Sequence, residues 1–441
     1  MLELVSLAER NSSGIWSIYR LTKNTDEVGI LGRPFKALRP NSETVNELVA
    51  PPYDVITRLE AKELAAEKPF SFLRVSRAEL EMDDDLDPYD KSVYERAHAN
   101  LNKLKSAGKL LLEDKPCFYV YQIRNSLHCQ TGLALSASVE AYKQNKILKH
   151  ELTRHAKETD RTRQIETVKA ITGPVLLVHA QNPDLDSQLT EVVASCTPDY
   201  SSVLDGWKHS VWIVSEDNVI KNIYSAVNKM EKLYIADGHH RSAAAARVAD
   251  SRNSQNTKSR DDAAAHNGFL AVTFPENEML ILDYNRVIKD LNNLSREVFL
   301  ERLSLNFQVE RSTSPVRPEK PKSFGMYLEG NWYVMHLNKN HHTTDPVGEL
   351  DVSILQQTVL NPILGISDPR TDSRIDFVGG SRGTKAISHL VDSGVMKVGF
   401  TVFPTKMTEL MAVADAGLIM PPKSTWFEPK LADGLLSIPL D

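Results

Sequence analysis

Residues 237–241, Asp-Gly-His-His-Arg, combine groups that bind anions with groups that transfer protons. The segment follows the apolar run 233–236 and precedes an alanine-rich stretch, a pattern that predicts a strand, a tight turn and a helix. A helix N-terminus presents free backbone N–H groups and the positive end of the helix dipole, so an anion binds there readily. Gly238 supplies backbone freedom, and Arg241 supplies a fork that matches a phosphate group.

The alternative is an ordinary helix with Asp237 as its N-cap, followed by the surface histidines His239 and His240. Two imidazoles and a guanidinium within one turn favour the anion site, because such a turn carries both charge and acid–base capacity.

Composition places the chain among soluble globular proteins. Its 441 residues are too many for one ordinary core and suggest two or three lobes, and 41% of them are hydrophobic and 25% charged. The formal net charge of −6 shows no basic excess, so no nucleic-acid partner is expected.

Cysteine content and hydropathy bear on the compartment. The three cysteines have no metal-ligand spacing, which is typical of a reducing compartment. No apolar run approaches the ~18 residues of a membrane span, and the first residues lack a signal-peptide pattern. We expect a cytoplasmic protein that does not bind membranes and acts on a small molecule; the oligomeric state is left open.

Helical and strand-like segments alternate along most of the chain, which predicts an α/β fold, with α+β as the alternative. A strand is expected at 174–179, helices at 160–171 and 219–230, and a hairpin at 324–337. Residues 249–267 and 310–323 are polar and are expected to be loops. We predict three lobes with these boundaries: an N-terminal α/β lobe at 30–140, a central lobe at 141–310 and a C-terminal α/β lobe at 324–441.

His150 and Glu151 form a second candidate constellation. A helical zinc pair needs histidines four residues apart, whereas His150 and His155 are five apart, so a metalloprotease site is excluded. An imidazole beside a carboxylate remains, followed by Arg161. The alternative is a charged loop that leads into a helix capped near residue 159 or 160.

Two further segments could bind phosphate. Residues 379–385 resemble a phosphate loop but end in Gly-Thr-Lys, so they are not a Walker loop, and a glycine-rich helix entry is expected. In the proline-rich stretch 420–430, Lys423 and Ser424 could hold a phosphate through a point charge and a hydroxyl. A rigid surface turn over a packed aromatic is an equally good interpretation.

Several motifs in order resemble a family catalogued as domain of unknown function 1015, known from bacteria and archaea. The resemblance covers nearly the whole chain except about the first 30 residues. It is carried by segments 33–36, 50–56, 71–74, 87–89, 150–151, 160–161, 236–241 and 420–430.

The central lobe, 141–310, is similar to the ParB/sulfiredoxin superfamily and above all to its free-serine kinases. The pair 150–151 matches a Pro-His-Glu element that precedes a helix, with Lys149 in place of the proline, and 237–241 matches an Asp-Gly-His-His-Arg turn. The resemblance implies that Glu151 is the general base and that the turn binds nucleotide phosphates. Because the turn contains no cysteine, a sulfiredoxin reaction is excluded.

From these observations we expect a nucleotide-dependent phosphotransferase that acts on a small, serine-like hydroxyl metabolite, with ATP or ADP and Mg²⁺ as cofactors. The alternatives are a phosphatase or nucleotide hydrolase at the same site, and a non-catalytic, ParB-like nucleotide-binding regulator. An enzyme is favoured, and no motif predicts a metal held by protein ligands alone. The expected catalytic residues are Glu151, His150 and Asp237, and the expected nucleotide- or phosphate-binding residues are Gly238, His239, His240, Arg241, Arg161, Lys423 and Ser424.

Overall fold

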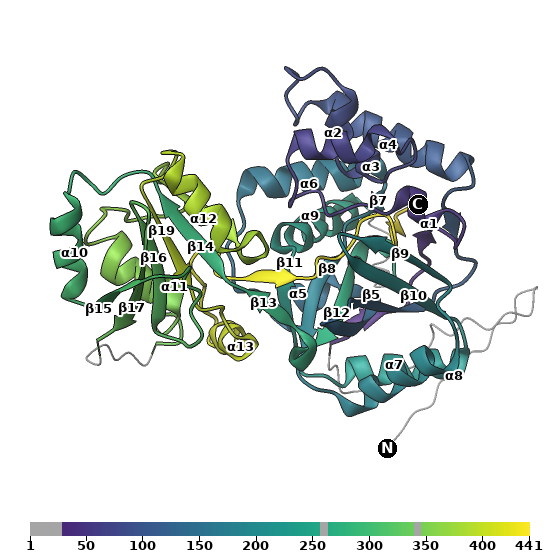
Figure 1. Ribbon diagram of the computed structural model, residues 1–441. Coiled ribbons are helices and arrows are strands. Elements are labelled where there is room, and N and C mark those ends of the chain that lie inside the picture. The colour runs from purple at the N-terminus through teal and green to yellow at the C-terminus, as the bar shows by residue number, and fades with distance from the viewer. Residues whose placement is uncertain (1–28, 256–262, 339–344) are drawn as a thin grey trace, which may run out of the picture.

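The computed structural model describes residues 29–255, 263–338 and 345–441. Two lobes are apparent in Figure 1. We call residues 29–279 with 429–441 the large lobe and residues 283–425 the small lobe. The mixed α/β class expected from the sequence is confirmed.

A nine-stranded sheet forms the centre of the large lobe within the described residues. Its strand order is β6-β11-β8-β12-β5-β4-β10-β9, and β1 pairs with β5 beside this path. The strands are β1 Gly32–Arg33, β4 Phe118–Arg124, β5 Cys129–Ser138, β6 Ile147–Leu148, β8 Val175–His179, β9 Tyr200–Leu204, β10 Trp207–Val214, β11 Leu233–Asp237 and β12 Gly268–Pro275.

Helices cover both faces of this sheet, α7 and α8 on one side and α6 and α9 on the other (Figure 1). Because both faces are covered, strands such as β8 and β12 are buried along their whole length and contain mainly apolar residues. The helices are α5 Val139–Lys143, α6 His155–Val168, α7 Pro183–Ser195, α8 Asp217–Asn228 and α9 His239–Gln255, and the 3₁₀ helices η2 Ala265–Asn267 and η3 Glu276–Glu278 flank β12.

Helices from the N-terminal part of the chain lie above α6, except the first, which packs against β9 (Figure 1). These elements are α1 Val45–Leu48, α2 Arg58–Ala66, α3 Leu73–Ser76, the 3₁₀ helix η1 Ala78–Glu81 and α4 Lys91–Ser106. Two short ribbons complete the lobe, β2 Leu38–Arg39 with β3 Leu111–Leu112, and β7 Ala170–Ile171 with β21 Ile438–Pro439.

A six-stranded antiparallel sheet, with the order β15-β17-β16-β19-β14-β18, forms the described small lobe. Its strands are β14 Tyr284–Ile288, β15 Phe307–Ser312, β16 Ser323–Leu328, β17 Asn331–Leu337, β18 Ile375–Gly379 and β19 Val398–Val402. Its helices are α10 Arg296–Ser304, α11 Asp351–Leu355, the π-helix η4 Gln356–Leu360, the 3₁₀ helix η5 Gly380–Arg382, α12 Gly383–Asp392 and α13 Met407–Asp415.

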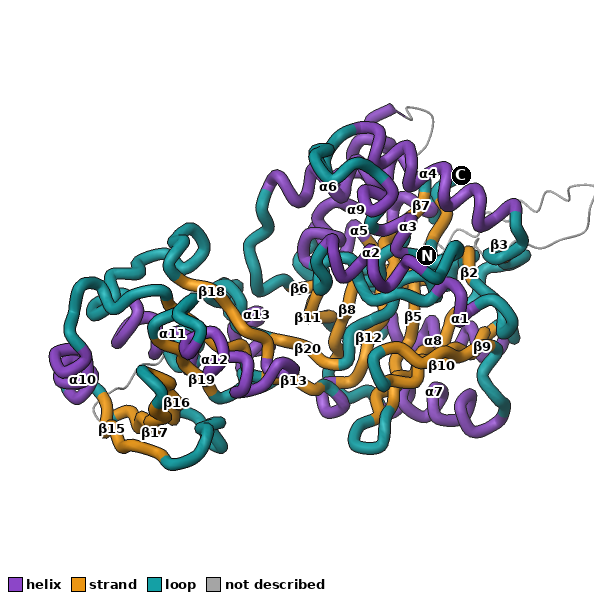
Figure 2. The backbone as a smooth tube through the Cα atoms, turned by 45° about the horizontal axis from the view of Figure 1, so that its top comes forward, coloured by secondary structure: helices purple, strands orange, loops and turns teal. Residues whose placement is uncertain are grey.

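The ribbon of β13 Leu280–Leu282 and β20 Trp426–Glu428 joins the two lobes (Figure 2). The chain therefore enters the small lobe through β13 and returns through β20 to finish inside the large lobe. Further contacts fix the junction: Asp415 at the end of α13 accepts hydrogen bonds from Lys232 (2.7 Å) and Tyr234 (2.9 Å) of the large lobe.

The expected lobe boundaries do not coincide with breaks between sheets. The boundary at 140–141 lies inside the nine-stranded sheet, because β5 pairs antiparallel with β12. The expected end of the central lobe at 310 falls within β15 of the small sheet. Residues 429–441, which we assigned to the C-terminal lobe, form backbone pairs with the large lobe at β7, Leu38 and Ala50.

Most predicted elements near the 237–241 turn are present, with shifted ends. The strand expected at 174–179 is β8, the helix expected at 219–230 is α8, and the helix expected at 160–171 begins earlier, as α6. The prediction of a loop at 249–267 is wrong for residues 249–255, because α9 continues to Gln255 and packs against α6. Residues 256–262 of that loop lie outside the described residues, as does the N-terminal stretch on which we based the absence of a signal peptide.

None of the helices in the described ranges is both long and apolar enough to cross a bilayer.

Candidate functional site

A cleft of about 1140 Å³ opens between the two lobes and below the N-terminal helices. One wall is the 237–241 turn with Glu151 to Arg154, the second is formed by residues 53–56 and 76–79 with parts of α4 and α6, and the third belongs to the small lobe and the ribbon. The volume slightly exceeds the upper end of the usual ~300–1,000 Å³ range for ligand pockets.

The 237–241 turn has the predicted strand–turn–helix form. Gly238 lies between β11 and α9 and has a φ of +101°, a backbone conformation that is unfavourable for residues with a side chain. The first helical bonds are donated by the amides of Arg241 and Ser242 to the Gly238 carbonyl, at 2.9 and 3.0 Å. The backbone amides of the preceding residues therefore belong to the unpaired first turn of a helix, at a point that lines the cleft.

Asp237 forms ion pairs with two cations, which identifies a function for it other than a helix cap. Its Oδ2 lies 3.2 Å from Nζ of Lys430, and its Oδ1 lies 3.8 Å from Nη2 of Arg241. Burial opposes ionisation of the carboxyl, but the nearby charges of Lys430 and Arg241 hold the pKa of Asp237 well below its usual range.

Arg241 is a buried connector between three segments. One guanidinium nitrogen donates to the Pro174 carbonyl, and Nη2 lies 3.4 Å from Oδ2 of Asp54. Although burial disfavours its charge, the carboxylates of Asp54 and Asp237 raise the pKa of Arg241, so it remains a cation. A guanidinium with this many partners holds the turn in place rather than being free to follow a ligand.

Glu151, His239 and His150 form a layered arrangement at one end of the turn. The amide of His150 donates to Nε2 of His239 over 3.4 Å, and Nδ1 of His239 faces Oε2 of Glu151 at 3.7 Å. The two imidazoles meet edge to face, with ring centroids 4.5 Å apart. Burial lowers the pKa of His239 to about 4, so its ring is neutral at neutral pH. Because Nε2 accepts from the His150 amide, the ring proton is assigned to Nδ1, on the side of Glu151 but beyond hydrogen-bond distance of it.

His150 lies behind the cleft rather than in it. Its side chain is 1% exposed and is not among the lining residues, whereas Glu151 lines the cleft. Burial lowers the pKa of His150 to about 3. The sequence placed His150 beside Glu151 as a catalytic residue; its position suits support of the His239 ring.

His240 lies on the cleft side of the turn. Its Nε2 accepts the backbone N–H of Arg154 at 3.0 Å, which ties the segment after Glu151 to α9. Burial lowers the pKa of His240, so this ring too is neutral near pH 7. The Arg154 side chain is exposed at the cleft and makes no ion pair or side-chain hydrogen bond with any residue that the structure describes.

Arg161 belongs to the second wall, on α6. Its guanidinium pairs with Asp160 at 2.8 Å and stacks 4.1 Å above the ring of Tyr53, and Asp160 also accepts the Tyr94 hydroxyl at 2.9 Å. Arg161 lines the cleft with its charge already partnered.

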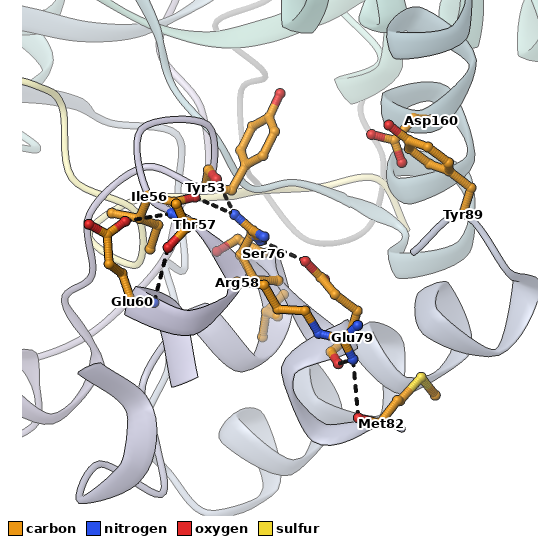
Figure 3. A network of polar contacts seen from close by, with 12 residues as sticks. Tyr53, Ile56, Thr57, Arg58, Glu60, Ser76, Glu79, Met82, Tyr89 and Asp160 are labelled. Atoms are coloured by element: carbon orange, nitrogen blue, oxygen red, sulfur yellow. Dashed lines mark hydrogen bonds and ion pairs between the residues drawn. The ribbon is translucent and has the colours of Figure 1, made fainter. Parts of the chain in front are cut away.

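The loop that carries Tyr53 is held by its carbonyl groups. Arg77 donates to the carbonyls of Tyr53 and Ile56 at 2.9 and 2.6 Å and pairs with Glu79 at 2.6 Å. Figure 3 shows this network, with the Tyr53 ring projecting away from it. At the end of the loop, the side chains of Thr57 and Glu60 cap α2 reciprocally.

The side chains of Lys423 and Ser424 have different environments in the structure. Lys423 lines the cleft, stacks 5.5 Å from the Tyr284 ring centroid and lies within electrostatic range of Glu151 and Asp237. Ser424 is 4% exposed, and its hydroxyl donates to the Pro421 carbonyl at 2.7 Å, so it stabilises the turn and does not reach the cleft.

Sequence reasoning missed Lys430 and the aromatic residues of the third wall. Lys430 stacks on Trp426 at 4.9 Å and reaches Asp237, while Tyr284 meets Trp426 at 5.2 Å. Lys430 lies in the proline-rich stretch that we singled out, seven residues after Lys423, and this repeat of basic residues was the available signal.

Basic residues slightly outnumber acidic residues along the cleft, although the chain is negative overall. The basic lining residues are Arg77, Arg154, Lys157, Arg161, Arg241, Arg370, Arg382, Lys423 and Lys430; the acidic ones are Asp54, Glu79, Glu151, Asp160, Asp237, Asp372 and Asp376. Such a lining suits an anionic ligand.

Comparison with known proteins places the chain in a family whose description is "Protein of unknown function (DUF1015)", with residues 33–353 matched. The 420–430 stretch lies beyond the matched residues. No curated protein matches the chain.

Among solved structures, similarity extends to a conserved hypothetical protein from Pyrococcus furiosus at 12% identity, with 69% of this chain and 94% of that chain covered and a TM-score of 0.33. A free serine kinase in complex with AMP shows 12% identity, coverage of 67% and 86%, and a TM-score of 0.34. SbnI from Staphylococcus aureus shows 13% identity, coverage of 70% and 87%, and a TM-score of 0.36.

Proposed function

Because the chain belongs to the DUF1015 family, whose description names no activity, we propose its function from the site: nucleotide-dependent transfer of a phosphoryl group to a small, serine-like hydroxyl metabolite. One observation carries the proposal. A carboxylate, Glu151, and an anion-binding helix start, the 237–241 turn, line the same positively charged cleft.

The proposed role of each residue in the cleft follows from the chemistry of its side chain or backbone. The backbone amides at the start of α9, with Lys423 and Lys430, bind and neutralise the phosphates, and Arg241 and Asp237 hold the turn in shape. Glu151 accepts the proton of the acceptor hydroxyl as its oxygen attacks the terminal phosphorus of the nucleotide, and the P–O bond to the departing nucleotide (ADP from ATP, or AMP from ADP) breaks. Neutral His239 lies beside Glu151, 3.7 Å from its carboxylate, and would donate its Nδ1–H to it on a small closure of the site, while His150 supports the His239 ring from behind.

Mg²⁺ would accompany the nucleotide. In proteins it is usually held by one or two carboxylates together with substrate phosphates. The described residues contain no group of three or more potential ligands, but Asp54, with 37% of its side chain exposed in the cleft, fits the smaller requirement. The ion would neutralise charge that develops on the transferring phosphoryl group.

The compartment we propose is the cytoplasm, which supplies nucleotide and keeps the three cysteines reduced.

Phosphoryl transfer to water at the same site, and nucleotide binding without turnover, are the two competing functions.

One assay distinguishes these functions. Purified protein is incubated with ATP or ADP, Mg²⁺ and a pool of hydroxyl metabolites, and nucleotide, phosphate and phosphorylated products are followed by mass spectrometry. Product that depends on the metabolite supports the proposal. Phosphate release without a metabolite identifies a hydrolase, and binding without turnover identifies a regulator; either result overturns the kinase assignment. Absence of binding overturns all three.

A further inference from the structure

The segment after Lys430 carries a carboxylate into the region behind the 237–241 turn. Asp433 and Ala50 exchange both backbone hydrogen bonds, at 2.9 and 3.1 Å, and the amide of Ala432 donates to the Tyr121 hydroxyl at 3.2 Å. These bonds fix the position of Asp433, which is only 1% exposed. The proposed mechanism gives it no role.

Asp433 lies close to Arg241 beside Gly173, outside the lining of the main cleft. A Cβ atom at Gly173 would lie 3.3 Å from Cδ of Arg241 and 3.8 Å from Oδ1 of Asp433, so both side chains adjoin the same point. Neither the oxygens of Asp433 nor the buried Nε of Arg241 has a hydrogen-bond partner of good geometry among the described residues, although the Ser76 hydroxyl lies near enough to Asp433 to favour its charged form. Buried polar atoms without partners are rare, which points to an additional group between them.

A small cavity provides the room for this group. It measures about 30 Å³ and is lined by Asp433 and Arg241 together with Tyr53, Ser76, Arg161 and Gln164. A cavity of ~10–15 Å³ with two to four polar partners is enough to hold one water molecule. All of these polar residues except Asp433 also line the main cleft, so the cavity adjoins it directly.

We infer that Asp433 is a positioning residue of the 237–241 turn: it holds Arg241 from behind through an ordered water and determines the charge beneath the anion site. Arg241 is thereby held by three carboxylates, directly by Asp54 and Asp237 and through the water by Asp433. The segment 431–440, which is remote in sequence from the turn, becomes part of the apparatus that shapes it.

The groups that face Asp433 make this charge sensitive to pH. They are Arg241 of α9, Arg161 of α6, Asp54 of the loop before α2, and the Ser76 hydroxyl of α3. Burial raises the pKa of Asp433 to about 7, opposed by the Arg241 charge and reinforced by Asp54. His239, with a pKa of about 4, and Tyr53, with a pKa of about 12, titrate far from neutrality.

The first test measures ATP affinity by calorimetry at about pH 6 and about pH 8 in the wild type and Asp433→Asn, which has the same shape but cannot ionise. Ionised Asp433 places a negative charge beneath the anion site, so the wild type should lose about 3- to 10-fold more affinity than the variant over this interval. Taking the difference between the two proteins removes the titration of the nucleotide itself. Superimposable pH profiles would overturn the inference.

Asp351 provides a matched control. It is another buried carboxyl whose pKa burial raises to about 7, but it lies in the small lobe and accepts the Lys322 amide. Asp351→Asn should therefore keep the wild-type pH profile. If it flattened the profile as Asp433→Asn does, the effect would be one of general stability, and the assignment of Asp433 would fall.

The affinity test rests on the proposed function, so a second test uses no nucleotide. Hydrogen exchange of a peptide that covers residues 236–243 is compared between the wild type and Asp433→Asn at each pH separately. At about pH 8, where wild-type Asp433 is ionised, the variant should exchange about 3-fold faster or more, and at about pH 6 the two should agree. Exchange that responds in a protein that binds no ATP would refute the proposed function alone; unchanged exchange at both pH values would refute the role of Asp433.

Discussion

Nζ of Lys430 lies 3.2 Å from Oδ2 of Asp237, and this ion pair joins the end of the inter-lobe ribbon to the turn that opens α9. The two residues are 193 positions apart in the sequence. Lys430 also stacks on Trp426, while Asp237 faces Arg241. The ribbon that leads to the small lobe is therefore tied to the 237–241 turn through Lys430.

This coupling can be measured with a double-mutant cycle of Lys430→Met and Asp237→Asn. The side chains of Lys430 and Asp237 are 19% and 32% exposed, and we expect a coupling free energy of about 1 kcal/mol in urea unfolding. The matched control is the inter-lobe pair Lys232–Asp415, whose side chains are 31% and 40% exposed. Its coupling should be smaller, since solvent screens exposed pairs. Equal coupling in both cycles would contradict a special role for the pair at the turn.

Gly238 is required at the turn for two reasons that can be separated. Its φ of +101° disfavours any side chain, and a Cβ atom there would lie 3.3 Å from the Arg241 guanidinium and from Cα of Val175. Gly108 also has positive φ, at +66°, but nothing lies within 4 Å of a Cβ placed on it. Gly238→Ala should cost about 1–3 kcal/mol in the free energy of unfolding, more than Gly108→Ala. A smaller cost at Gly238 would show that the turn can relax.

Glu151→Gln tests whether Glu151 is the general base, as we propose. The amide keeps the shape of the side chain but cannot accept the proton, so turnover should fall by about 10²- to 10⁴-fold while ATP affinity changes little. Glu166 lies exposed on α6 and outside the cleft, and Glu166→Gln should retain full activity. Measurement of kcat and KM together with calorimetric binding decides the matter: full activity in Glu151→Gln would remove the assigned role.

His150 makes the free energy of unfolding depend on pH in the acidic range. Burial lowers its pKa to about 3, so between its ordinary value of about 6.5 and 3 the unfolded chain binds a proton that the folded chain does not. The free energy of unfolding therefore falls as pH falls through this interval. His150→Phe keeps a ring against His239 and removes the titration, so its melting temperature should drop less between about pH 6.5 and about pH 4.5. His155→Phe, at an exposed position, should follow the wild type; an identical drop in both variants would contradict the assignment.

Local sequence patterns were sufficient for the elements around the turn. The apolar run 233–236, Gly238 and the alanines after Arg241 predicted β11, the turn and α9, because each rests on neighbouring residues alone. The end of α9 was missed because its polar C-terminal part is stabilised by tertiary contacts, such as the hydrogen bond of Asn253 to Asn267 at 2.7 Å.

Contacts between segments that are far apart in the sequence could not be predicted from local sequence patterns. Nothing near β5 indicates that it pairs with β12, about 130 residues later, so the large sheet was divided at residue 140. Likewise Ser424 and Lys423 are adjacent and similar in polarity, but the turn buries one and exposes the other. No sequence motif includes Asp433, and only the tertiary path of the chain brings it close to Arg241.

The C-terminal segment also has a consequence for the order of folding. Leu431, Leu435, Leu436 and Ile438 are buried in the large lobe, although the whole small lobe lies between them and the rest of that lobe in the sequence. During synthesis the small lobe can assemble as soon as residue 425 has emerged, whereas the core of the large lobe stays incomplete until residues 431–440 follow. The lobe that begins first on the ribosome is thus the one that finishes last, and the surroundings of its 237–241 turn are complete only when this segment is in place.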